Sequence, residues 1–114
     1  MDIKSMTVGE AMQIAAMFGA TKNAGASAYD ALVGRGVFVR AVTNHFTGRL
    51  VAVTDGELVI EDAAWIADSG RWSSALVSGV LGEIEPYPDG RVIVSRGAVV
   101  DVCEWPHALP RGVK

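Results

Sequence analysis

The sequence predicts a mainly β fold: a small, strongly bent barrel of five strands, with an N-terminal amphipathic helix and an insertion between strands three and four. Short apolar runs rich in β-branched residues recur along the 114-residue chain, and turn signals separate them. Half of the residues are apolar and a fifth are charged, which is typical of a folded domain. Asp-Gly pairs at 55–56 and 89–90 are strong turn signals between such runs.

The chain divides into three parts on this pattern. Residues 1–34 hold the N-terminal helix and a linker, and residues 106–114 form a proline-punctuated tail. Residues 35–105 form the barrel, with the insertion at about 63–88. The insertion carries two tryptophans and a short helical segment that Gly79 stops.

The N-terminal helix is expected at residues 7–18. Thr7 is a suitable N-cap, and Glu10 follows at the spacing of a capping box. Apolar residues recur at helical spacing, and Gly19 can end the helix. The resulting apolar stripe packs either on the chain's own barrel or on a neighbouring subunit, and the sequence leaves both open.

The first half of the barrel is predicted to be a three-stranded meander. Thr47-Gly48 supplies its first turn. Asp55-Gly56 supplies the second, as a type I′ turn with positive φ at both central residues. The three strands are expected at Val37–Phe46, Arg49–Thr54 and Glu57–Glu61.

The second half of the barrel is predicted to be two strands joined by a short turn. Prolines 86 and 88 hold the preceding residues extended, and Asp89-Gly90 turns the chain. The strands are expected at Arg91–Val94 and Ala98–Trp105, with Ser95–Gly97 between them. Pro106 ends the last strand.

Two blocks of this pattern resemble the motifs of Sm proteins, over about half of the chain. Residues 47–62 are similar to the first Sm motif, in which a Gly at the start of a bent second strand precedes a turn and an apolar third strand ending in acid. Residues 93–102 are similar to the second, where an Arg-Gly turn links strands four and five. SH3-like barrels share such β-turn-β patterns. The resemblance implies rings closed by pairing strand four of one subunit with strand five of the next.

Two departures from the Sm pattern are visible. Sm proteins usually place a polar Asn or Asp between strands two and three to hold a base, and Asp55 is the one candidate here. The insertion is also longer than in minimal Sm proteins. Residues 63–71, 83–86 and 105–110 further resemble a group of small, uncharacterised phage and prophage proteins, which implies a viral origin and no particular activity.

The net charge, the few cysteines and histidines, and the lack of catalytic motifs argue against several classes of function. Ten basic against thirteen acidic residues give a net charge of −3, which argues against a general polyanion binder and leaves a local basic patch open. Cys103 is the single cysteine, so no intrachain disulfide forms, and we expect a small buried apolar side chain beside Val102, with a reactive thiol as the alternative. His45 and His107 are the only histidines, so we expect no metal site and no cofactor. No catalytic motif is present, and we do not expect an enzyme.

Polar, cationic and aromatic residues at two turns and in the insertion form the candidate ligand site. Arginine offers a planar fork for phosphate, and tryptophan offers a surface on which a base stacks. The alternative is that both tryptophans fill core or interface and that the arginines are solvated. The candidate residues are Asn44, His45, Thr47, Arg49, Trp65, Asp68, Arg71, Trp72 and Arg96.

The function expected from the sequence is a non-enzymatic, ring-forming, phage-encoded binding module. Its partners would be further copies of itself in a cyclic homo-oligomer and a nucleotide-type anion, either short RNA or a small nucleotide that it sequesters. The alternative is a structural component of a phage virion that contacts other virion proteins. No signal peptide and no apolar run of about 18 residues is present. We therefore expect no membrane association and a location in the host cytoplasm.

Overall fold

The computed structural model describes residues 27–114. The predicted N-terminal helix at residues 7–18 and most of its linker lie outside the described residues. The chain divides into two units, Met1–Ala31 and Leu32–Lys114, and the second unit holds the sheet. In the part of the chain that the structure describes, no helix has the length and apolarity needed to cross a membrane.

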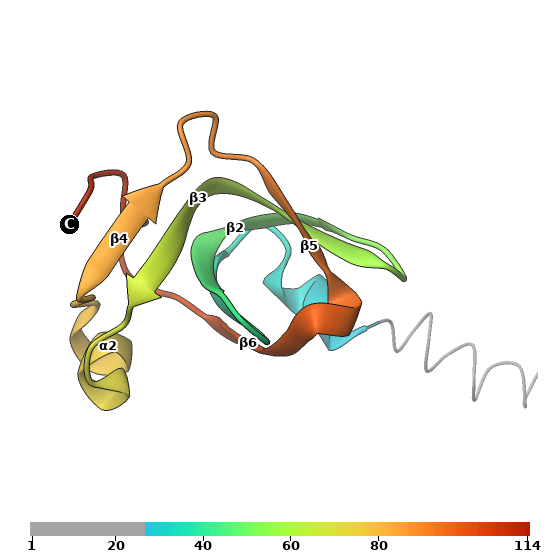
Figure 1. The fold of residues 1–114 in the computed structure, drawn as a ribbon. Coiled ribbons are helices and arrows are strands. Elements are labelled where there is room, and N and C mark those ends of the chain that lie inside the picture. Colours follow the sequence, from blue (N-terminus) through green and yellow to red (C-terminus); the bar gives the residue numbers. More distant parts are fainter. Residues whose placement is uncertain (1–26) are drawn as a thin grey trace, which may run out of the picture. The chain divides into compact units, whose positions relative to one another are not determined.

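Residues 27–114 form a mainly β structure with one α-helix (Figure 1). The predicted mainly β class and the bent antiparallel sheet are confirmed, but the described strands number six rather than five. In chain order the elements are η2 (Ala28–Leu32), β1 (Gly36–Ala41), β2 (His45–Val53), β3 (Glu57–Asp68), α2 (Trp72–Ser78), β4 (Glu83–Pro86), β5 (Val92–Ser95), η3 (Arg96–Ala98) and β6 (Val99–Glu104).

All strand pairs are antiparallel, and the sheet runs in the order β4-β3-β2-β1-β6. β5 pairs with the first part of β3, whereas β4 pairs with its last part. β3 is long enough, at twelve residues, to serve both partners. Among the described residues β5 and β6 do not pair with each other, so the barrel is left open between them.

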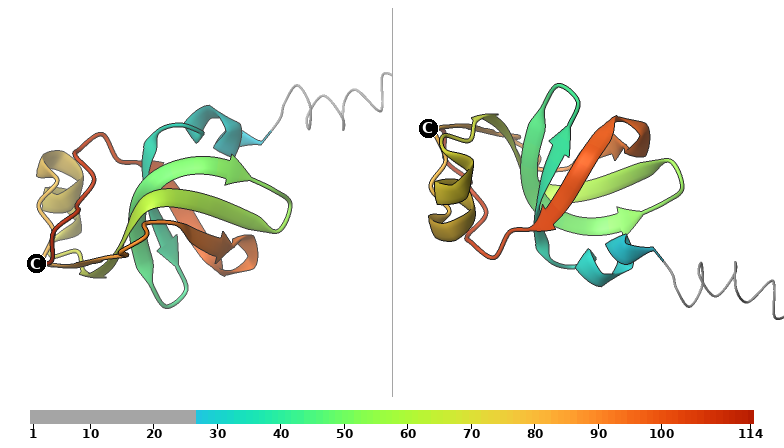
Figure 2. Two further views of the ribbon diagram at one scale, coloured as in Figure 1. Left: turned by 90° about the horizontal axis from the view of Figure 1, so that it is seen from above. Right: turned by 90° about the horizontal axis from the view of Figure 1, so that it is seen from below.

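The extra strand is β4, which the sequence placed only as an extended part of the insertion. It pairs with the far end of β3, because β3 continues to Asp68 instead of ending at Glu61. The helix expected in the insertion is present as α2, and Gly79 ends it in the left-handed conformation with φ 77°. Figure 2 shows α2 and the C-terminal residues at one end of the sheet, opposite the β2–β3 turn.

The first turn of the meander is not at Thr47-Gly48, as the sequence predicted. The chain reverses at residues 42–44, where the Ala41 N–H donates to the Asn44 carbonyl over 2.8 Å. Gly48 instead lies in the middle of β2, in register with Val37 of β1. The prediction failed because glycine marks a close approach between strands here, rather than a turn.

Gly48 lies where β2 meets a bulge in β3. Thr47 pairs with Ala64 and Arg49 with Glu61, so two residues of β3 face the single Gly48. A Cβ on Gly48 would lie 3.0 Å from the Ile60 Cβ and 3.1 Å from the Glu61 carbonyl oxygen. The bulge also holds Asp62 at φ 52°. The missing side chain thus lets the two strands bend together.

The turn at Asp55-Gly56 is present, but it is not of type I′. Neither residue has positive φ. The Thr54 hydroxyl oxygen accepts the N–H groups of Gly56 (3.2 Å) and Glu57 (3.1 Å). This side chain stabilises a turn with ordinary φ values, a local contact that the Asp-Gly signal does not encode.

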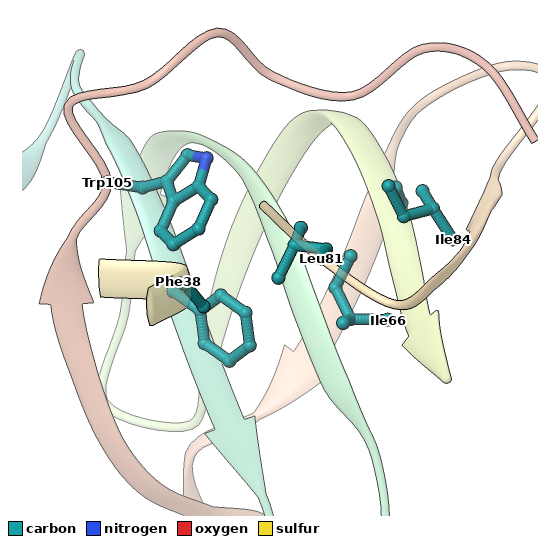
Figure 3. Close-up of a cluster of buried hydrophobic side chains, with 7 residues drawn as sticks. Phe38, Ile66, Leu81, Ile84 and Trp105 are labelled. Carbon is teal, nitrogen blue, oxygen red and sulfur yellow. The ribbon is translucent and has the colours of Figure 1, made fainter. Parts of the chain in front are cut away.

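The sheet has a buried cluster on each face. Val37 and Val39 point to the inner face, which the bend encloses, together with Leu50, Leu58 and Ile60, all fully buried. The intervening Phe38 points to the outer face. There the insertion and the C-terminal tail cover an aromatic and aliphatic cluster made of Phe38, Ala64, Ile66, Ala75, Leu81, Ile84 and Trp105 (Figure 3).

The C-terminal residues are part of the fold rather than a loose tail. Trp105 is 2 % exposed in the outer-face cluster. Arg111 donates to the carbonyls of Ala63 (2.9 Å) and Tyr87 (3.0 Å). Ile84 and Lys114 exchange two backbone hydrogen bonds, which cover the outer edge of β4.

We predict that Gly48→Ala lowers the free energy of unfolding by about 1–3 kcal/mol, because the new methyl group overpacks the contact with β3. Gly56→Ala is the matched control, since nothing lies within 4 Å of a Cβ there. It should stay within about 0.5 kcal/mol of wild type. Urea denaturation of both variants measures the difference, and equal stability of the two would contradict this account of the bend.

Candidate functional site

A polar and aromatic group lies on the outer face of the sheet, beside the open edge of β6. Arg40 of β1 is in register with His45 of β2 and with Asp101 of β6, so the three side chains share a face. Trp72 at the start of α2 joins them, with the Arg40 Cζ 5.7 Å from its ring centre. We call Arg40, His45, Trp72 and Asp101 the Arg40 cluster.

An ion pair holds the centre of the Arg40 cluster. The Arg40 Nε donates to Asp101 Oδ1 over 2.8 Å, and its Nη2 donates to Oδ2. This bidentate contact lowers the pKa of Asp101 from its usual 3.8 and raises the pKa of Arg40. The side chains of Arg40 and Asp101 are 38 % and 47 % exposed, so the pair is within reach of a ligand from solvent.

The Phe38 ring packs against the two ring-bearing members of the Arg40 cluster, Trp72 and His45. Its ring lies 4.7 Å from the Trp72 ring and 5.7 Å from the His45 ring, both in edge-on geometry. Neighbouring Cys103 is partly buried, and desolvation raises the pKa of its thiol. A neutral thiol is a poor nucleophile, and the Cys103 side chain packs against the outer-face cluster.

The structure brings together part of the predicted site. His45 and Trp72 both belong to the Arg40 cluster, exposed Asn44 precedes His45, and exposed Arg71 precedes Trp72. Sequence reasoning missed Arg40 and Asp101. Their opposite charges were visible, but the pairing of β1 with β6 joins residues 61 positions apart.

Three predicted site residues do not fit this group. Thr47 is fully buried within the described residues, so its side chain is not exposed beside this group. Trp65 is 41 % exposed but pairs with Phe46, which points to the face opposite His45. The Asp68 carboxylate accepts the Gly70 N–H over 2.8 Å and so stabilises a turn.

Arg49 belongs to a second charged network at the β3 bulge. It donates to Asp62 over 2.6 Å and to Glu61 over 3.1 Å. Glu61 also accepts from Arg91, whose hydrogen bond is the main cause of the lowered pKa of Glu61. These contacts hold the bend between β2 and β3, so Arg49 has a structural role.

Arg96 lies at a third place, where η3 meets the β2–β3 turn. Its Nη1 donates to the Thr54 carbonyl over 2.7 Å, and its backbone N–H donates to the Gly56 carbonyl over 3.0 Å. The Asp55 turn and the Arg96 turn, 41 residues apart in sequence, are therefore neighbours. The predicted residues thus occupy separate places instead of one constellation.

Metal ligands are not grouped in residues 27–114, where no set of three His, Cys, Asp or Glu side chains converges. His45 lies in the Arg40 cluster. The His107 Nε2 lies 2.8 Å from the Leu76 carbonyl, and its ring packs edge-on against Trp105. The two histidines thus have separate surroundings.

The second candidate functional feature is the pair of strand edges that the open barrel leaves free. β5 is hydrogen-bonded only to β3, and β6 only to β1, within the described part of the chain. Each carries a large exposed apolar side chain: Ile93 on β5 is 60 % exposed and Val100 on β6 is 62 % exposed. These are features of surfaces that associate with another strand.

No family model matches the sequence, and no curated protein matches it. Among solved structures, the chain is similar to the P. aerophilum SmAP1 heptamer, with a TM-score of 0.49 and 19 % identity over 68 % of this chain and 88 % of that one. It is also similar to a heptameric archaeal Sm protein, with a TM-score of 0.48 and 19 % identity over 68 % of this chain and 94 % of that one.

We predict that Asp101→Asn removes a contribution to stability that is present at neutral pH and lost in acid. Because the folded pKa of Asp101 lies below its unfolded value, the ion pair stabilises the protein above the usual carboxyl pKa and is lost as pH falls through the folded value. The variant should melt below wild type at neutral pH, and the gap should close as the pH falls through the lowered pKa of Asp101. Thermal melts across that range measure it, with exposed Asp89→Asn as control. A gap that is constant with pH would contradict the prediction.

Proposed function

We propose that this chain is a non-enzymatic binding module that assembles head to tail into a closed homo-oligomeric ring. In this ring β5 of each subunit pairs with β6 of the next, and the assembly binds a nucleotide-type anion, either short RNA or a small nucleotide that it sequesters. We further propose that it is phage-encoded and acts in the host cytoplasm. The observation that carries the proposal is that β5 and β6 each have one edge that pairs with no other strand in the described residues.

The sheet has a third outer edge, on β4, and this edge differs from those of β5 and β6. On β4 the backbone groups of Ile84 are satisfied by Lys114, so that edge is covered within the subunit. β5 and β6 have no such cover in the described residues, and they expose Ile93 and Val100. Exposed apolar strand edges promote association unless they are protected. The contrast supports β5 and β6 as the assembly surfaces.

The arrangement of the two edges favours a ring over a dimer. A two-fold dimer uses the same patch on both subunits, whereas β5 against β6 joins two different patches. Head-to-tail contacts of this kind close into a ring when the rotation between neighbours permits. Pairing β5 with β6 also satisfies both edges of every subunit, whereas a dimer through one edge leaves the other unpaired.

The Arg40 cluster and its neighbours support this ligand class. Trp72 offers an aromatic surface, exposed Arg71 next to it has its side chain available to an anion, and Asn44 and His45 supply further polar groups. A stacked base contributes about 1–3 kcal/mol, so a few contacts suffice despite the negative net charge. Arg96 at the β2–β3 turn is a second candidate contact in the same assembly.

A second candidate function is a structural part of a virion. The outer side of α2 favours it, because Val77 is 82 % exposed and Val80, just beyond the helix, is 57 % exposed. Apolar side chains of this kind suit contact with another protein. Mass spectrometry of purified particles distinguishes the two, since only a virion component is present in them in stoichiometric amounts.

We predict that the wild-type protein is a closed oligomer at micromolar concentration and that Ile93→Lys or Val100→Lys dissociates it. Each lysine places a charge on an edge that must be desolvated for assembly. Val77→Lys introduces the same charge at an exposed apolar position away from both edges and should leave the oligomer intact. Size-exclusion chromatography with light scattering measures the mass, and a monomeric wild type would exclude the ring.

We predict that short RNA, a cyclic dinucleotide or a mononucleotide raises the melting temperature of the wild-type protein. A ligand of the folded state adds RT ln(1 + [L]/Kd) to its stability, or about 2.7 kcal/mol at a hundredfold excess over Kd. Arg71→Ala should reduce the shift, because it removes an exposed cation without removing a contact of the fold. Arg111→Ala cannot be the control, because it would break the hydrogen bonds from Arg111 to backbone carbonyls. The control is Lys114→Ala, which removes an exposed cation. No shift with any of these compounds excludes the nucleotide-type ligand.

A further inference from the structure

One charged side chain points outward on β6, and another points outward immediately before β5. On β5, Val94 pairs with fully buried Leu58 and points inward, so the alternate positions 93 and 95 point outward, and position 91 immediately before the strand continues this row. Arg91 accordingly reaches the outward Glu61. Of these three outward side chains, Arg91 alone is charged.

The same reasoning gives the outward row of β6. Val102 is in register with buried Val39 and points inward, whereas Asp101 is in register with Arg40 and points outward. Cys103 is the next outward position, in register with Phe38. The outward charge of β6 is therefore Asp101, opposite in sign to Arg91, which immediately precedes β5.

Pairing β5 of one subunit with β6 of the next restricts how these rows can meet. A shift of one residue would turn the inward side chains of one strand outward, so a continuous sheet keeps inner with inner and outer with outer. The row of Arg91 then lies beside the row of Asp101. Directly opposite residues have Cβ atoms about 5 Å apart and diagonal ones about 7–8 Å, and a long arginine side chain spans either.

We propose that the partner subunit's Arg91 binds Asp101 across the β5–β6 junction and completes the Arg40 cluster. This inference rests on the proposed ring. Asp101 would then lie between two guanidinium groups, Arg40 of its own subunit and Arg91 of its neighbour. The anion site would combine Trp72, Arg40 and Arg71 of one subunit with Arg91 of the next, so an isolated subunit would lack one of its cations.

The contacts within one subunit permit this exchange. Arg91 is bound to Glu61, but its side chain is 64 % exposed, and Glu61 keeps a second partner in Arg49. Asp101 is 47 % exposed and keeps Arg40. Surface ion pairs contribute little to stability, so Arg91 can turn to a new partner at small cost.

The same charges disfavour the alternative pairings. Two copies joined through β6 and β6 would bring their Asp101 carboxylates to the same junction, and two joined through β5 would do so with Arg91. Like charges across adjacent strands are destabilising. The pair therefore selects the head-to-tail contact that a ring requires.

A charge exchange tests the contact on the full chain. Arg91→Glu alone and Asp101→Arg alone should each raise the dissociation concentration of the oligomer at least about tenfold, because each sets like charges against each other at every junction. The double variant restores opposite charges and should dissociate closer to wild type than either single variant. Since Arg91 binds Glu61 and Asp101 binds Arg40 within the subunit, such a rescue requires contact between subunits. Glu83→Arg, on β4, makes the same change of charge away from both open edges and should have no effect.

The outcomes separate this inference from the ring itself. An oligomeric wild type whose double variant is no better than the weaker single variant overturns the Arg91–Asp101 contact and leaves the ring standing. A monomeric wild type overturns both.

A crosslink gives a second reading if a charge variant fails to fold. Arg91→Cys with Asp101→Cys, in a Cys103→Ala background, should give a ladder of linked subunits on a non-reducing gel. Glu83→Cys with Asp101→Cys in the same background is the control and should give none. Absence of a ladder from an oligomeric double-cysteine protein overturns the contact.

Discussion

The close packing of Gly48 against the bulge of β3 is the contact on which the rest of the fold depends. With no side chain at Gly48, β2 and β3 approach closely enough to bend, and the bulge turns the second half of β3 away from the first. The Ala63 N–H at the bulge is satisfied by the Gly90 carbonyl at 2.7 Å, and Arg111 binds the Ala63 carbonyl. Segments distant in the sequence thus fix the bend.

The division of β3 at this bend gives the subunit its two faces. Its first half carries β5 and closes over the inner core, whereas its second half carries β4 and supports the outer-face cluster. The insertion and the C-terminal residues cover that outer cluster and the edge of β4. Nothing in the described residues covers β5 and β6, and the Arg40 cluster lies beside the edge of β6. Assembly and ligand binding would therefore use adjoining surfaces.

Local signals in the sequence were reliable where local contacts decide the structure. The short helix ended by Gly79, the turn at Asp55-Gly56 and the Arg96-Gly97 turn between two strands all lie where the sequence predicted them. The errors arose where a residue's role depends on a distant partner. Gly48 was predicted to be a turn, although its role is to admit Ile60 of β3.

The sequence by itself determined a β-rich domain with short strands, tight turns and an apolar content sufficient for a core. It also contained the resemblance to the two Sm motifs, because each motif is a short continuous stretch, at residues 47–62 and 93–102. Only the tertiary structure decided which strands remain unpaired and which charges meet. Arg40 and Asp101 form a site only after β6 pairs with β1, and strand pairing across 61 residues depends on the summed packing of the whole barrel.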